Sequence, residues 1–355
     1  MIRIAIGLVL TAALLAACAQ PAPPAVPGVP HMTLDTVFTE DGAELPLRSF
    51  LPAGPPRAVL IALHGFNDYS NAFSEAGLYF MDRGVALYAY DQRGFGDAPD
   101  RGLWVGQRRL IADLTLVVNL VRAKHPGVPV YLLGESMGGA LAMVAMAEPD
   151  PPPVDGVILD APAVRGRATL TGLERAVLEV TSAVIPWFTV TGQGLHIIPS
   201  DNITMLRQLS GDRLMIFHTR IDAVRGLVDL MDAALAATSR LTAPTLILTG
   251  ARDEIVTPIP TCLMLARLPP RPPGAWRSML YPHGYHMLLR DRDAEIVMAD
   301  IDAWIGDRTA ALPSGDERLT QAADATPAGI ARLPTCHAVA AELREHPEFG
   351  ALAAR

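Results

Sequence analysis

The sequence VYLLGESMGGALAMVAM, residues 130–146, decides the fold. Its first four residues are an apolar run typical of a buried strand, and residues 138–147 have the composition of a helix. Between them stands a Gly-x-Ser-x-Gly motif with Ser136 at its centre. A turn tight enough to join a strand to a helix leaves no room for a Cβ at Gly134 or Gly138. The pattern therefore predicts that Ser136 is a nucleophile on a sharp turn between strand and helix.

Short apolar runs alternate with helical patterns on both sides of this stretch. The alternation indicates βαβ units and a mainly parallel sheet that helices cover on both faces. A hairpin around Glu40-Asp41-Gly42, residues 34–51, is expected at the sheet edge. The runs predicted as strands are residues 58–63, 85–90, 130–133, 157–159, 245–248 and 278–281. The predicted helices are residues 72–83, 108–124, 138–147 and 291–305.

One long interval, between residues 159 and 245, breaks this alternation. Its apolar segments, residues 170–190 and 226–237, favour helices, so we expect a helical cap of about residues 163–240 inserted after the sixth strand. The cap lies within a catalytic domain predicted over residues 32–308. Residues 309–355 are rich in Ala, Thr and Pro, and we expect a weakly ordered tail with a hint of a short helix at 339–344.

A serine hydroxyl needs a base to take its proton and an acid to orient that base. Where serine stands on such a turn, the acid and then the histidine follow it in the chain. Asp253 comes just after the predicted strand 245–248, and His286 lies on the loop after the strand 278–281. These two residues are the predicted acid and base. Glu254 is the rival acid and His283 the rival base.

Acyl transfer also requires backbone N–H groups that stabilise the oxyanion of the tetrahedral intermediate. Met137 directly follows the serine at the start of a helix and is predicted to supply one N–H. Phe66, on the loop after the strand 58–63, is predicted to supply the other. His64 on the same loop is interpreted as a residue that shapes the loop, without a catalytic role.

Five segments in this order resemble the monoacylglycerol lipase and lysophospholipase-like branch of the α/β-hydrolases, a branch grouped with the serine aminopeptidases. They are His64-Gly65-Phe66, Asp91-Gln92-Arg93-Gly94-Phe95-Gly96, residues 134–139, residues 250–253 and Gly284-Tyr285-His286. The resemblance covers about residues 34–306. It implies an α/β-hydrolase fold, Ser136, Asp253 and His286 as the catalytic triad, and oxyanion N–H groups from Phe66 and Met137. It implies structural roles for Asp91 and Arg93.

The resemblance also implies that the cap covers the serine and lines an acyl-chain pocket. Candidates for this lining are Leu178, Val184, Ile185, Trp187 and Phe188, although the same residues are equally able to form the cap's own core. The chain departs from the mammalian monoglyceride enzymes in two places. It has Asn67-Asp68 where they have a Gly and charged residues, and Glu135 where they have a His before the serine.

The N-terminus has the pattern of an export signal. Arg3 is followed by an apolar stretch, residues 4–17, and Leu-Ala-Ala precedes Cys18. This resembles a bacterial lipoprotein signal, so we expect a signal peptide over residues 1–17, a lipidated Cys18 and a proline-rich tether over 18–31. The protein would then be an exported lipoprotein of the cell envelope, anchored on a periplasmic or outer-membrane face. An ordinary secretory signal and an uncleaved anchor are the alternatives.

The chain has two further cysteines, Cys262 and Cys336, and export would place both in an oxidising compartment. There they could form a disulfide, but two buried free thiols are an equally good interpretation of the sequence. The spacing of the two residues does not decide between these states.

Composition and motifs exclude several classes of function. The net charge of −8 and the lack of clustered Lys and Arg argue against a nucleic-acid binder. No metal-ligand spacing and no phosphate-binding glycine loop is present, so we expect neither a metal nor another cofactor. The sequence thus predicts a hydrolase of lipid or other apolar carboxylic esters. An aminopeptidase or amidase with the same triad, and a non-catalytic binding lipoprotein, are the alternatives.

Overall fold

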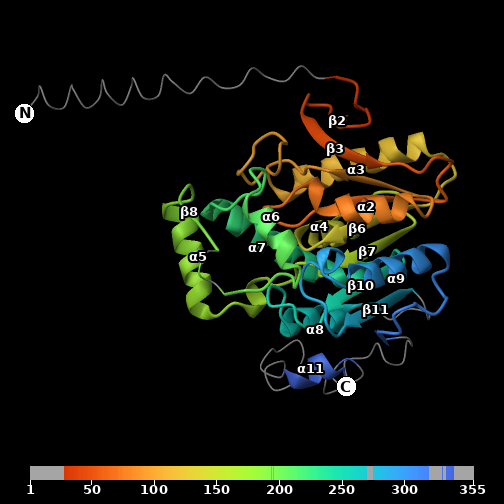
Figure 1. The fold of residues 1–355 in the computed structure, drawn as a ribbon. Helices are drawn as coiled ribbons and strands as arrows, with labels where there is room; N and C mark the ends of the chain where they lie inside the picture. Colours follow the sequence, from red (N-terminus) through yellow and green to blue (C-terminus); the bar gives the residue numbers. More distant parts are fainter. Residues whose placement is uncertain are drawn as a thin grey trace, which may run out of the picture.

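The computed structural model describes residues 28–192, 194, 196–269, 275–319, 330 and 333–339. Within them, one ten-stranded sheet has the order β1-β2-β3-β5-β4-β6-β7-β10-β11-β12 (Figure 1). The strands β5, β4, β6, β7, β10 and β11 are parallel, and each contains one of the six runs predicted as strands. The predicted α/β-hydrolase fold class is confirmed. The bounds of these strands are β4 (Ala58–Leu63), β5 (Val85–Tyr90), β6 (Val130–Glu135), β7 (Gly156–Asp160), β10 (Thr245–Gly250) and β11 (Trp276–Tyr281).

An antiparallel extension begins the sheet, formed by β1 (His31–Met32), β2 (Thr36–Phe38) and β3 (Glu44–Phe50). The strands β2 and β3 pair as the predicted hairpin, and β3 then pairs with β5. Gly42 has a φ of 77° in the connecting turn, a backbone conformation that glycine adopts without strain.

Helices cover both faces of the sheet, as the near-continuous apolar strands require. Alternate residues of β4 point to opposite faces: Val59, Ile61 and Leu63 pack in one core cluster, and their neighbours pack in the other. The first cluster includes residues of α3 (Gln107–Lys124), α4 (Met137–Met146) and α8 (Pro258–Arg267). The second includes residues of η1 (Ser70–Phe73), α2 (Ser74–Met81), η4 (Leu288–Arg290) and α9 (Ala294–Gly306).

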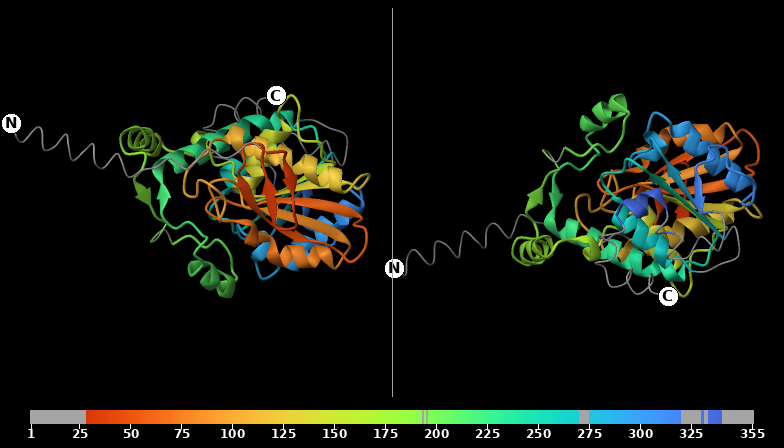
Figure 2. Two further views of the ribbon diagram at one scale, coloured as in Figure 1. Left: turned by 90° about the horizontal axis from the view of Figure 1, so that it is seen from above. Right: turned by 90° about the horizontal axis from the view of Figure 1, so that it is seen from below.

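The segment between β7 and β10, residues 161–244, carries the helices expected of an insertion. Two of them, α5 (Gly172–Val184) and α7 (Ile221–Ala237), occupy the stretches where helices were predicted. The helix α7 packs on α4, whereas α5 and α6 (Ile203–Ser210) stand apart from the sheet (Figure 2). The helix α6 was not predicted, because it has only eight residues. The remaining elements are η2 (Arg167–Thr169), β8 (Thr189–Val190), β9 (Thr219–Arg220) and η3 (Thr238–Arg240).

Parts of the C-terminal stretch are ordered on the body of the protein. The strand β12 (Glu317–Leu319) pairs antiparallel with β11. Cys336 of α11 (Pro334–Ala338) forms a disulfide with Cys262 of α8, which settles the question left open by the sequence. These residues differ from the weakly ordered tail that we expected, because strand pairing and a covalent bond fix them. Of the stretch 339–344, only Val339 lies within the described residues, directly after α11.

Residues 1–27, which include the predicted signal peptide of residues 1–17, lie outside the described residues. The expectations for Cys18 and for most of the tether therefore stay predictions. In the part of the chain that the structure describes, no helix combines the length and apolar character needed to cross a bilayer.

Candidate active site

Ser136 stands on a strained turn between β6 and α4. Its φ of 53° and ψ of −112° are unusual for a residue with a side chain. A Cβ on Gly134 would lie 2.5 Å from the carbonyl oxygen of Gly138, and one on Gly138 would lie 2.0 Å from that of Leu63. Real Cβ atoms do not come so close to backbone atoms. The surrounding backbone therefore leaves room only for glycine at both positions, as the motif predicted.

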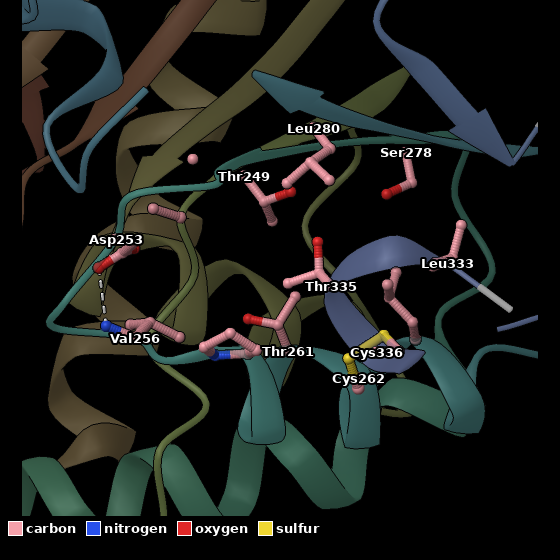
Figure 3. Close-up of a pocket in the computed structure, with 14 residues that line it drawn as sticks. Thr249, Asp253, Val256, Thr261, Cys262, Ser278, Leu280, Leu333, Thr335 and Cys336 are labelled. Carbon is pink, nitrogen blue, oxygen red and sulfur yellow. Dashed lines mark hydrogen bonds between the residues drawn. A yellow bond between two sulfur atoms is a disulfide. The ribbon is translucent and has the colours of Figure 1, made fainter. Parts of the chain in front are cut away.

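Asp253 and His286 meet at the carboxyl ends of β10 and β11. The Nδ1 atom of His286 lies 2.8 Å from Oδ2 of Asp253, and both side chains are only 5% exposed. The other oxygen of Asp253 accepts the N–H groups of Ile255 and Val256 at 2.8 and 2.9 Å (Figure 3 shows the Val256 bond). Since both oxygens are held, the carboxylate fixes the imidazole in one orientation. Ser136 and His286 line the same pocket.

The rival acid and base are engaged elsewhere. His283 is exposed, and its Nδ1 lies 2.9 Å from Nη2 of Arg252. Glu254 accepts the backbone N–H of Ile198 at 2.8 Å. The structure thus brings Asp253 and His286 together and leaves the two alternatives outside this pair.

The loop after β4 is held by buried polar contacts. His64 Nδ1 lies 2.8 Å from the carbonyl oxygen of Gly65, and its Nε2 accepts the N–H of Gln92 at 3.0 Å. Burial lowers the pKa of His64, which keeps the ring neutral. Both nitrogens are used by the backbone, so His64 shapes the loop and has no nitrogen left for a substrate. Phe66 lines the same pocket as Ser136, and Met137 is the first residue of α4.

Asp91 and Arg93 hold the loop after β5 in place. Their contacts agree with the structural roles that the resemblance implied for both residues. One oxygen of Asp91 accepts the N–H of Ser70 at 2.9 Å, and the other accepts the N–H of Asp97 at 2.8 Å. Arg93 forms paired hydrogen bonds with Asp113 and with Asp41 at 3.0 to 3.1 Å. These contacts join the loop to the hairpin turn and to α3.

A buried ion cluster borders the site. The guanidinium of Arg290 pairs with Asp68 at 2.8 Å and with Glu135 at 2.5 Å, and each of the three side chains is at most 5% exposed. Burial acts to lower the pKa of Arg290, but the two carboxylates outweigh it and the pKa is raised. The cluster therefore joins the loop of Phe66 to the serine turn. Asp68 and Glu135 stand out in the sequence as departures from the mammalian enzymes, whereas no sequence pattern marks Arg290, their common partner far along the chain.

Asp160, at the end of β7, adds a buried carboxyl group to these surroundings. Its side chain is fully buried, and neither oxygen receives a hydrogen bond from the described residues. Burial, followed by the charge of Glu135, raises the pKa of Asp160 well above its ordinary value. Its backbone oxygen accepts the N–H of Ser136 at 2.9 Å, which ties the serine turn to β7.

The pocket has a volume of about 330 Å³ and a largely apolar wall. The wall comes from the loops around the site, from α7 and from Met215. The five cap residues proposed as lining are not in this wall, and Val184, Trp187 and Phe188 are 64%, 62% and 55% exposed. That prediction was wrong, because α5 and the residues that follow it stand away from the sheet. The apolar residues of the wall are Phe66, Ala163, Met215, Leu227, Met231, Ile255, Val256 and Met287.

A second cavity lies beside Asp253, between the end of the sheet and α8 and α11 (Figure 3). Thr249 and Leu280 border it from the strands, and Thr335 borders it from α11. The disulfide of Cys336 belongs to its lining. The C-terminal stretch therefore contributes to the surroundings of the predicted acid.

Comparison with known proteins places this chain in a family. The chain is 27% identical to the monoglyceride lipase of Rattus norvegicus over 291 residues, 79% of this chain and 93% of the relative. It is 23% identical to the monoacylglycerol lipase of Mycolicibacterium smegmatis, over 72% and 90% of the two chains. The solved monoacylglycerol lipase of Paleococcus ferrophilus has a TM-score of 0.63 at 21% identity, over 75% and 99% of the chains. Residues 54–293 match the family model described as serine aminopeptidase, S33, and the chain belongs to this family.

Proposed function

We propose that the protein is a carboxylic ester hydrolase that cleaves monoacylglycerols, lysophospholipids or similar apolar esters through an acyl-Ser136 intermediate. The observation that carries this proposal is the hydrogen-bonded pair of Asp253 and His286, whose imidazole lines one apolar pocket together with Ser136. The curated relatives named as monoglyceride lipases support an ester as the bond cleaved.

In the proposed mechanism, Nε2 of His286 takes the proton of Ser136 while the serine oxygen attacks the ester carbonyl. The oxyanion of the tetrahedral intermediate is bound by the N–H groups of Phe66 and Met137. The intermediate collapses when His286 gives its proton to the leaving alcohol, and an acyl-serine remains. Water then attacks the acyl group with His286 as base, which releases the acid and restores the serine. Asp253 orients the imidazole throughout, through its hydrogen bond with Nδ1.

The charges around the pocket favour an ester over a peptide with a free amine. An aminopeptidase has to hold the ammonium group of its substrate, and a carboxylate is the usual partner. The carboxylates of Asp68 and Glu135 line the pocket, but Arg290 pairs with both. Asp253 is engaged with His286. None of these three acids is therefore available to an amine.

The test of this function compares octanoylglycerol with leucine p-nitroanilide, at equal concentrations of the purified protein. We expect steady release of octanoate and no release of nitroaniline above the rate without enzyme. The Ser136→Ala variant is the control for contaminating hydrolases. Cleavage of the anilide without cleavage of the ester would contradict the proposal.

We also propose that Cys18 carries the lipid that tethers the mature chain to a membrane, on the strength of the Leu-Ala-Ala-Cys sequence. When the full chain is expressed in a bacterium that processes lipoproteins, we expect it in the membrane fraction. The Cys18→Ser variant should lose the lipid mass and leave that fraction. Equal partitioning of the two proteins, with no lipid on the wild type, would contradict the tether.

A further inference from the structure

One guanidinium that the mechanism does not use, that of Arg165, lines the pocket together with Ser136 and His286. Arg290 is not among the residues that line the pocket, and its guanidinium pairs with two carboxylates. Arg165 is the basic residue in the pocket lining, and it has no ion pair or hydrogen bond from its side chain to any described residue. Arg167, two positions along, differs sharply, since it pairs with Glu179, Asp229 and Asp232.

The backbone on which Arg165 stands is fixed from both sides. Val164 before it is fully buried. After it, the N–H of Arg167 donates to Asp232 at 2.6 Å, and a Cβ on Gly166 would lie 2.1 Å from the same carboxylate. A half-buried side chain on a fixed backbone loses less freedom when a ligand binds than one on a loose loop.

The acid that interacts with Arg165 electrostatically, Glu174, has other partners. It accepts hydrogen bonds at 2.8 Å from the backbone N–H and from the hydroxyl of Thr171, in the capping box that begins α5. The attraction lowers the pKa of Glu174 less than the contacts with Thr171 do. The guanidinium of Arg165 therefore remains open to a ligand in the pocket.

We propose that Arg165 is a specificity-determining residue that binds an anionic group of the ester substrate. A guanidinium presents paired N–H donors that match a phosphate or a carboxylate, while the apolar wall of the pocket accommodates the acyl chain. The favoured substrate class is then an amphiphilic acyl ester with a phosphate or carboxylate in its alcohol part, ahead of neutral monoacylglycerol. This inference rests on the proposed ester hydrolase function.

The experiment measures kcat and KM for three octanoyl esters, below the concentrations at which they form micelles. The alcohols are glycerol, glycerol phosphate and lactate, so the series contains a neutral, a phosphate and a carboxylate head group. The enzymes are the wild type, Arg165→Ala, Arg165→Lys and Arg240→Ala. Arg240 is an exposed arginine on η3, outside the pocket lining, so its variant controls for the change in net charge.

We expect Arg165→Ala to lower kcat/KM about tenfold or more for one or both anionic esters, mainly through KM, and to lower it much less for octanoylglycerol. The lysine variant should recover part of the loss, and the Arg240 variant should resemble the wild type. The ester that responds identifies whether phosphate or carboxylate is preferred. Added salt should reduce the advantage of the anionic ester.

Equal losses on all three esters would show a structural role for Arg165 and overturn the inference, as would no loss on either anionic ester. If the wild type cleaves octanoylglycerol but the variant keeps the wild-type ratio of anionic to neutral turnover, only the role of Arg165 is wrong. If the wild type cleaves none of the three esters, the proposed function itself fails.

Discussion

We expect Ser136→Ala to lower kcat for ester hydrolysis by a factor on the order of 10⁶ and to leave the thermal unfolding of the protein nearly unchanged. Removing the hydroxyl removes the nucleophile, whereas the turn keeps its shape because its close contacts involve Gly134 and Gly138. Hydrolysis of a nitrophenyl ester measures the loss of activity. Labelling by a fluorophosphonate, followed by mass spectrometry, should show one modified residue in the wild type and none in the variant.

A matched pair of histidine variants is the control for this result. His286→Ala should lose activity to a similar degree, because it removes the base that lies 2.8 Å from Asp253. His283→Ala should retain wild-type activity, since that ring is exposed and in contact with Arg252. Inactivity of His283→Ala beside an active His286→Ala would contradict the assignment of the base.

We expect Arg290→Met to lower the free energy of unfolding by about 3–5 kcal/mol. The variant leaves the carboxylates of Asp68 and Glu135 in a site where they are 4% and 2% exposed, without the cation that compensates them. The loop that carries Phe66 also loses its link to the serine turn, so kcat should fall at temperatures where the variant is still folded. Urea unfolding and ester hydrolysis measure the two effects.

Arg122→Met is the control, because Arg122 pairs with Asp155 at the surface, where the side chains are 39% and 38% exposed. Removal of such a pair costs about 1 kcal/mol or less. Adding Asp68→Asn and Glu135→Gln to Arg290→Met should restore part of the lost stability, since neither carboxylate is then left buried without its cation. A loss for Arg290→Met no larger than that of the surface control would refute the compensating role.

The parts of the fold that were predicted from the sequence are those with one strong local cause. Strands such as β4, buried on both faces, are continuous apolar runs, and their bounds could be read directly. The serine turn was predictable because its sterics admit only glycine at two positions. Asp253 and His286 were predictable because each follows the carboxyl end of a parallel strand, and those ends share one edge of the sheet.

The parts that were missed depend on contacts between distant residues. The apolar residues of α5 and of the segment after it give no sign of whether they face a pocket, a core or water, and Trp187 and Phe188 turned out to be exposed. Likewise, no local pattern marks Arg290 as the partner of Asp68 and Glu135. The pairing of the two cysteines depends on a Cα to Cα separation of 5.7 Å that only the folded chain defines.

The bond between Cys262 and Cys336 turns part of the polypeptide into a closed ring. The two cysteines are 74 positions apart, and His286 lies inside the ring while Ser136 and Asp253 lie outside it. In the chain-entropy model, a ring of this size disfavours the unfolded state by about 4 kcal/mol. A single cleavage between the two cysteines would leave both fragments covalently joined, so the histidine would stay attached to the rest of the molecule.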